Sequence, residues 1–295
     1  NQAEMTTDPK ADDDKVGDAL NAQRFQMLED IANELKGDVV FPTYFDAAMR
    51  LRKELQNPDL PTKRLASIVS LEPLIATKLM NLAKSVLYSP DGTPARNLPA
   101  AISRLGFDLV RSTALAIAMN QLMRSKDMSA YCDLTAALWE HSLKTAAAAR
   151  ILARTHTRIS PDEALLAGLV HDLGAFYMLY RAAQYSELRS RPDTMKHVIV
   201  QWHESIGTAL LNALGMPEEV VEAATDHDQP RPAPNPLRTL TDVIYIANIL
   251  AGPHSEWICQ DTGQNTSEPE NIRQTYSELI PEIEADAKEM QAVFA

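Results

Sequence analysis

The side chains most capable of chemistry in this sequence are polar residues that lie within apolar stretches. They comprise four histidines, one aspartate and one asparagine: His141, His171, Asp172, His203, His227 and Asn248. Imidazole and carboxylate groups bind divalent metals and also hydrogen-bond to each other. A buried histidine taken alone is more often a hydrogen-bonded core residue than a ligand. Several such groups on the inward faces of successive helices favour one convergent site.

His171 and Asp172 carry the strongest signal among these residues. They interrupt the apolar run from 164 to 179, and Asp172 shares a helical face with Leu165 and Phe176. Removing one partner of a buried charge pair costs on the order of 3–5 kcal/mol, because the remaining charge is left uncompensated. Asp172 therefore needs a partner inside the core, and we expect the neighbouring histidines to supply it.

The composition indicates that helices position these residues. Ala, Leu, Glu and Lys are abundant and favour helices, whereas the chain has only 10 Gly. Long β-branched runs between Gly-rich turns, the mark of a sheet, are missing. We therefore expect an all-α protein. The apolar spacing predicts helices around the candidate site over residues 134–155, 164–180, 196–214, 218–227 and 240–250.

The helical pattern begins at Arg24 and runs to about residue 252 without internal repeats. We expect residues 22–252 to form one domain, with an N-terminal helical half (22–130) and a second half (131–252). No flexible linker separates the halves, so we expect them to pack as one unit.

The two ends of the chain differ from this domain in composition. Residues 1–21 are acidic and poor in apolar residues, and we expect them to be disordered. The sequence pattern over residues 253–295 predicts a polar loop followed by a final charged helix over 271–293.

The charge and cysteine content restrict the partners and the compartment. The net charge of −12 repels phosphate groups, which argues against a nucleic-acid partner and against an anionic membrane. Cys132 and Cys259 belong to no CxxC motif, as is typical of a reducing compartment. The sequence shows no signal-peptide pattern, and its longest apolar run is too short to span a bilayer. We expect a cytoplasmic protein.

The order and spacing of the polar residues resemble the HD superfamily of metal-dependent phosphohydrolases. The segments that carry the resemblance are WEHSLKTAAAARILA, EALLAGLVHDLGAF and HESIGTALLNALGMPEEVVEAATDHD. The first half resembles the HDOD subgroup, the HD-related output domain, through LPTKRLASIVSLEPLIATKLMNLAKS and LPAAISRLG. The resemblance covers roughly residues 35–252. It implies a multi-helix, HD-domain-like bundle with an N-terminal helical half.

The resemblance also implies a divalent metal, which would be Mn, Fe, Zn or Mg. The implied metal ligands are His141, His171, Asp172 and Asn248, with His203 and His227 beside them or at a second metal. A weak or absent metal remains open at this stage, because Asn248 stands where the hydrolases carry a final Asp. A neutral amide oxygen compensates less of the metal's charge than a carboxylate does.

Two further departures bear on catalysis. Ala175 stands where catalytic relatives commonly have a Lys that holds phosphate. The HHE and GYP segments of cyclic di-GMP phosphodiesterases are missing, and HDQP at 227–230 takes their place. The first departure argues against catalysis, and the second argues against specific cyclic di-GMP hydrolysis.

Two functions follow from these observations. The first is a non-catalytic output or regulatory domain in bacterial signal transduction, with a degenerate metal site and with protein partners. The second is a metal-dependent phosphohydrolase that acts on a nucleotide or phosphodiester, in which Asp172 and His203 take part in catalysis and the metal activates a water. A nucleotide-like ligand is compatible with either function, and the sequence leaves the oligomeric state open.

Overall fold

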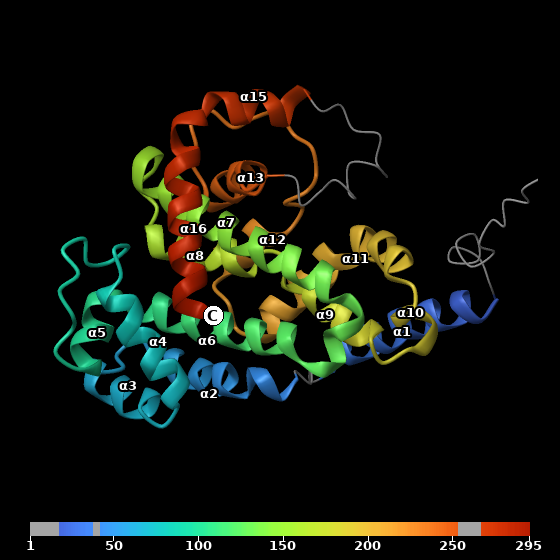
Figure 1. The fold of residues 1–295 in the computed structure, drawn as a ribbon, viewed down its shortest axis with the longest axis horizontal. Coiled ribbons are helices and arrows are strands. Elements are labelled where there is room, and N and C mark those ends of the chain that lie inside the picture. Colours follow the sequence, from blue (N-terminus) through green and yellow to red (C-terminus); the bar gives the residue numbers. More distant parts are fainter. Residues whose placement is uncertain (1–17, 38–41, 253–266) are drawn as a thin grey trace, which may run out of the picture.

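The computed structural model describes residues 18–37, 42–252 and 267–295. Every regular element in these ranges is helical, which confirms the predicted all-α class. Helices α2 and α3 lie at one end of the molecule, and α13 and α15 lie at the other (Figure 1). Within the described ranges, no helix combines the length and the apolar character that crossing a bilayer requires. One hydrophobic core runs through the molecule from Leu20 to Phe294.

The first half of the chain consists mostly of short helices. They are α1 (Asp18–Lys36), the 3₁₀ turn η1 (Thr43–Phe45), α2 (Asp46–Leu55), α3 (Thr62–Val69), α4 (Pro73–Lys84), α5 (Leu98–Leu105) and α6 (Phe107–Arg124). Helix α1 begins six residues before Arg24, so residues 18–21 of the acidic segment are helical, and residues 1–17 lie outside the described residues. Asn97 caps α5 by accepting a hydrogen bond from the Ala100 amide, and a proline stands in its first turn.

The second half holds the longer helices. They are η2 (Lys126–Tyr131), α7 (Cys132–His156), α8 (Pro161–Val170), α9 (Leu173–Ala182), α10 (Ser186–Arg189), α11 (Pro192–Ala213), α12 (Glu218–Ala224) and α13 (Leu240–Leu250). Ser160 caps α8, and Thr239 and Asp242 form a reciprocal capping box at the start of α13. Helix α13 begins at the predicted residue 240, whereas α8 begins three residues before the predicted 164.

Two helix predictions near the site are wrong in the same way. Residues 164–180 do not form one helix, because α8 ends at Val170 and a turn at His171 and Asp172 precedes α9. Helix α12 ends at Ala224 rather than near His227, and Asp226 adopts a positive φ of 56° in the turn that follows. Both breaks escaped the sequence analysis because buried apolar residues continue across the first one, and no glycine or proline marks the second.

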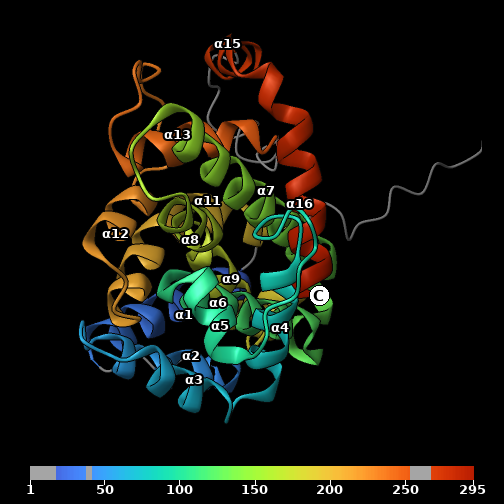
Figure 2. The same cartoon turned by 90° about the vertical axis from the view of Figure 1, so that its left-hand side faces the viewer.

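The C-terminal region is a further correction, since the predicted helix over 271–293 is divided into three elements. Helix α15 (Ser267–Thr275) and the turn η3 (Ser277–Leu279) precede α16 (Ile280–Phe294). Helix α16 packs against α7, α4 and α6 (Figure 2), and Met290 is fully buried. Arg154 of α7 pairs with Glu282 of α16, which strengthens the contact at its rim. Helix α16 therefore belongs to the core.

Candidate metal centre

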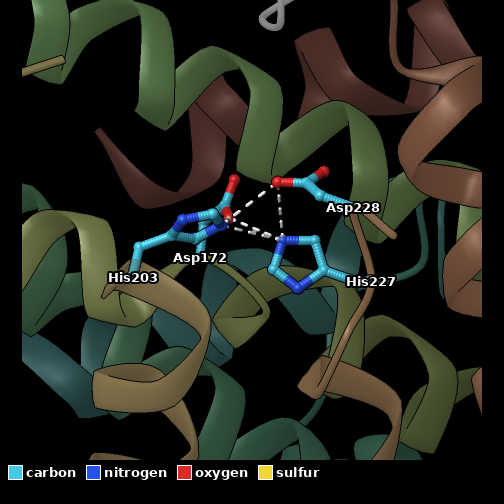
Figure 3. Close-up of side chains that lie close together, drawn as sticks. All are labelled: Asp172, His203, His227 and Asp228. Atoms are coloured by element: carbon cyan, nitrogen blue, oxygen red, sulfur yellow. Dashed lines mark hydrogen bonds and ion pairs between the residues drawn. The ribbon is translucent and has the colours of Figure 1, made fainter. Parts of the chain in front are cut away.

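The structure brings all six of the predicted polar residues into one buried cluster. His141 comes from α7, and Asn248 comes from α13. His171 and Asp172 form the turn between α8 and α9, His203 lies on α11, and His227 lies in the turn after α12. Each of these residues is at most 7% exposed. Figure 3 shows part of the cluster, in which the side chains of Asp172, His203, His227 and Asp228 lie close together.

A close contact between α9 and α11 places Asp172 beside His203. A Cβ atom added at Gly174 would lie 2.0 Å from the His203 carbonyl oxygen and 2.6 Å from the Gly207 amide nitrogen. The two helices therefore touch through their backbones, two residues after Asp172. Gly168 allows a similarly close contact between α8 and α7, because a Cβ there would lie 2.7 Å from Ala146 Cα. Glycine at these positions allows the helices to approach closely enough to form the cluster.

Three histidines present the same ring nitrogen to the cluster. In His171, His203 and His227, Nδ1 lies 2.6–2.7 Å from a backbone carbonyl oxygen three or four residues earlier. A carbonyl oxygen only accepts, so each Nδ1 carries a proton and donates it. In a neutral ring, Nε2 is then an acceptor. This arrangement is the one that metal-binding histidines commonly have, with the outer nitrogen held by a backbone oxygen.

The Nε2 atoms of these rings face carboxylate oxygens, which also only accept. His227 Nε2 lies 2.9 Å from Asp172 Oδ1, and His203 Nε2 lies 3.1 Å from Asp228 Oδ2. The Nε2 atoms of His203 and His227 are themselves 3.4 Å apart. Such a group of acceptors requires positive charge, supplied either by protons on the rings or by a metal ion that replaces them. The residues present therefore fit a cation.

The electrostatics of the cluster show how the metal-free protein supplies that charge. Burial disfavours the charged His227 ring, but Asp228 and Asp172 outweigh burial and raise its pKa to about 10. The same balance raises the pKa of His203, where Asp228 is the main carboxylate partner. Burial would raise the pKa of Asp172, yet His171 and His227 hold it well below its usual range.

Asp172, His203, His227 and Asp228 have the spacing of a metal-binding set (Figure 3). Distances between pairs of their donor atoms are 2.9, 3.1, 3.4, 3.5 and 3.6 Å. A tetrahedral ion with bonds of about 2.0–2.1 Å holds its donors about 3.3 Å apart. The observed distances bracket this value. Two imidazoles and two carboxylates suit Zn, Mn or Fe better than Mg, which prefers oxygen ligands.

His141, His171 and Asp172 form a second group of candidate ligands. His171 Nε2 lies 3.2 Å from Asp172 Oδ2, and His141 Nε2 lies 3.9 Å from the same oxygen. Asp172 thus offers one oxygen to each group, because its Oδ1 faces His203 and His227. The carboxylate could therefore bridge two ions.

Asn248 connects the two groups by hydrogen bonds. Its Nδ2 donates to Asp228 Oδ1 at 2.8 Å, which leaves its Oδ1 facing His141 Nε2 at 2.8 Å. The amide oxygen only accepts, so His141 Nε2 carries a proton and donates it. A protonated ring nitrogen offers no lone pair to a metal. In this arrangement, His141 donates a hydrogen bond, and it would bind a metal only after losing that proton.

Asp228 was not predicted from the sequence, in which Asp172 was the only carboxylate assigned to the site. Asp228 is 11% exposed and contacts both His203 and His227. The available signal was the His227-Asp228 pair, which repeats the His171-Asp172 pair. A helix predicted to continue to His227 gave Asp228 no inward direction. The turn at Asp226 returns the chain toward the cluster and aims both residues at it.

The all-helical fold and the buried His/Asp cluster define a protein of the HD type. Residues 41–230, more than half of the chain, match the family model described as HDOD domain. The chain therefore belongs to the HDOD domain family, which confirms the resemblance seen in the sequence.

Several solved structures have the same fold. A protein from Shewanella amazonensis SB2B, described as a "Putative metal-dependent phosphohydrolase", is 24% identical and has a TM-score of 0.69 over 93% of this chain and 100% of that chain. An HDOD domain protein of unknown function from Geobacter sulfurreducens is 20% identical, with a TM-score of 0.56 over 91% and 98% of the two chains. A "Putative signal transduction protein" from Marinobacter aquaeolei VT8 is 21% identical, with a TM-score of 0.52 over 92% and 66%.

Among curated proteins, the chain is similar to an "Uncharacterized protein" of Treponema pallidum (strain Nichols). The two are 22% identical in an alignment 215 residues long, which covers 68% of this chain and 40% of the relative. The chain therefore spans less than half the length of the curated relative that it matches.

Proposed function

We propose that this HDOD domain is a cytoplasmic bacterial signal-transduction module that acts on protein partners and does not hydrolyse a substrate. The observation that carries the proposal is the burial of the cluster: Asp172 is 1% exposed, His203 4% and His227 1%. A catalytic metal keeps a position open for water and substrate. A centre whose ligands are at most 11% exposed is better suited to holding helices together. The description of the Marinobacter aquaeolei structure supports a signalling role.

We further propose that the cluster binds one transition-metal ion through Asp172, His203, His227 and Asp228. These ligands would join the start of α9 to α11 and to the turn after α12, so the ion would stabilise the packing of the second half. When bound, the ion supplies the positive charge that four acceptor atoms require. Asn248 then serves to orient Asp228 and to occupy His141.

Elemental analysis of protein purified without a histidine tag tests the metal proposal. After incubation with Zn, Mn or Fe and desalting, we expect a stoichiometric ion in the wild-type protein and a large loss in Asp228→Asn. The matched control is Asp226→Asn, two residues away, because Asp226 is exposed and Asn tolerates its positive φ. Wild-type protein that retains no ion would refute the metal proposal and leave a protonated hydrogen-bond network.

The alternative function, a metal-dependent phosphohydrolase, is favoured by one observation. A cavity of about 530 Å³ reaches His141 at the edge of the cluster, and Lys144 and Arg273 line it. A substrate phosphate could therefore approach the cluster from that side.

Activity assays separate the two functions. Metal-loaded protein should show no turnover of p-nitrophenyl phosphate, its bis ester or a nucleotide panel above a metal-only blank. Turnover that is abolished by both Asp172→Asn and His203→Ala, and retained by Asp226→Asn, would overturn the signalling proposal in favour of the hydrolase.

A further inference from the structure

We infer that the cavity beside His141 is a binding site for a small organic anion with an apolar body. The cavity has a volume of about 530 Å³, within the range of about 300–1,000 Å³ that small-molecule sites have. It lies between α7, the end of α13, α15 and α16. These helices lie together in the upper part of Figure 1.

The apolar part of the lining defines the body of the ligand. Ala137 of α7, Leu250 at the end of α13 and the following Ala251 contribute to this part of the lining, as do Ile280 and Ile283 of α16. Apolar surfaces contributed by different helices suit a flat or compact hydrophobic group, because such a group removes these surfaces from water when it binds.

The charged part of the lining defines the anion. Arg273 donates from Nε to the Ile249 carbonyl oxygen at 3.2 Å, which holds its guanidinium at the cavity. Lys144 pairs with Glu140 at 3.1 Å, and the side chains are 31% and 62% exposed. An exposed pair of this kind contributes only about 0–1 kcal/mol, so the ammonium group can exchange its partner for a ligand anion. A phosphate or carboxylate group fits these two cations.

The acidic residues of the lining limit the choice further. Glu140 and Glu284 also border the cavity. Their carboxylates accept hydrogen bonds from hydroxyl or amino groups and repel additional negative charge. The site therefore favours an anion with one acidic group and donor groups elsewhere. The nucleotide-like ligand expected from the sequence belongs to this class.

The cavity is distinct from the proposed metal position. Of the cluster residues, only His141 lines it, and the four proposed ligands do not. Helices α13, α15 and α16 lie beyond residue 230, where the HDOD match ends. The inference therefore goes beyond the proposed function and stands whether or not the cluster binds metal.

Calorimetric titration of the full chain with phenylphosphonate tests the inference. The carbon–phosphorus bond of this probe resists phosphohydrolases, so binding is measured without turnover. We expect saturable binding that is unchanged after metal removal with EDTA, and at least tenfold weaker binding of inorganic phosphate, which has no apolar body. Benzoate and AMP as parallel probes distinguish a carboxylate, a phosphate and a nucleotide.

Two pairs of variants locate the binding. Ala137→Trp, on the exposed cavity side of α7, should abolish binding, whereas Ala136→Trp on the adjacent exposed position should not. Lys144→Ala should weaken binding at least tenfold, whereas Lys84→Ala, an exposed lysine outside the cavity, should leave it unchanged. The inference is overturned if none of the organic anions binds, or if both tryptophan variants bind as the wild type does.

Discussion

Replacing Gly174 with alanine should separate α9 from α11 and disrupt the cluster. The added Cβ would lie 2.0 Å from the His203 carbonyl oxygen, and ordinary contact begins near 3.4 Å. The two backbones would therefore have to separate by about 1.4 Å. Overpacking of this kind typically lowers the free energy of unfolding by about 1–3 kcal/mol. The clashing atoms here belong to the backbone, which can move less than a side chain. Metal–ligand distances tolerate only about 0.2 Å, so the proposed metal site would be lost as well.

Gly207→Ala provides the matched control for this prediction. Gly207 faces Gly174 across the same contact, but a Cβ there would lie 3.4 Å from the nearest atom. Alanine inside α11 should stabilise the folded protein by up to about 1 kcal/mol, because it favours a helix more than glycine does. We expect the unfolding midpoint of Gly174→Ala to lie roughly 5–10 °C below that of Gly207→Ala, from about 2–4 °C per kcal/mol. Circular dichroism and elemental analysis provide the two measurements. Equal midpoints would show that the close α9–α11 contact at Gly174 is not needed for the stability of the fold.

Three other perturbations have expected outcomes. Asn248→Asp should lower metal content in elemental analysis, because a carboxylate at 248 cannot donate to Asp228 and repels its carboxylate, and unchanged metal content would mean that residue 248 does not orient Asp228. Chelator-treated protein should become less stable to urea as the pH rises toward 10 from about 6.5, which is the pKa of histidine in an unfolded chain. In the folded protein the pKa of His227 is raised to about 10, so its bound proton stabilises the fold at lower pH and is lost as the pH approaches 10. A free energy of unfolding that rises between about pH 6.5 and 10 would contradict this prediction. Met290→Ala should lower the free energy of unfolding in urea by about 2–5 kcal/mol, because Met290 is fully buried on α16. Gln291→Ala should change it little, because Gln291 is exposed.

Much of the fold could be predicted from the sequence, because local signals fix it. The helix over 240–250, for example, was predicted from its apolar spacing, and α13 spans the same residues. The inward faces of α7 and α11 were correctly read, since His141 and His203 are both buried among apolar neighbours.

The parts of the site that the sequence could not show depend on backbone direction after a helix ends. Asp228 follows His227 in a turn, where side-chain periodicity no longer gives orientation, whereas Asp172 was predicted from the apolar run around it. The hydrogen bond from Asn248 to Asp228 joins residues 20 positions apart and has no local signal. The resemblance to HD hydrolases predicts that Asn248 stands in place of a metal-binding Asp. The geometry shows in addition that a carboxylate from another segment lies beside it.

The packing of α16 has a consequence for how the protein is made. Helices α4, α6 and α7 lie between 73 and 156 in the sequence, yet they are completed by contacts with residues 280–294. Synthesis proceeds from the N-terminus, so the apolar faces of these helices stay uncovered until more than a hundred further residues have emerged from the ribosome. Uncovered apolar surface in a folding intermediate promotes aggregation. Chaperone dependence during synthesis should therefore be greatest in the interval before α16 is available to dock.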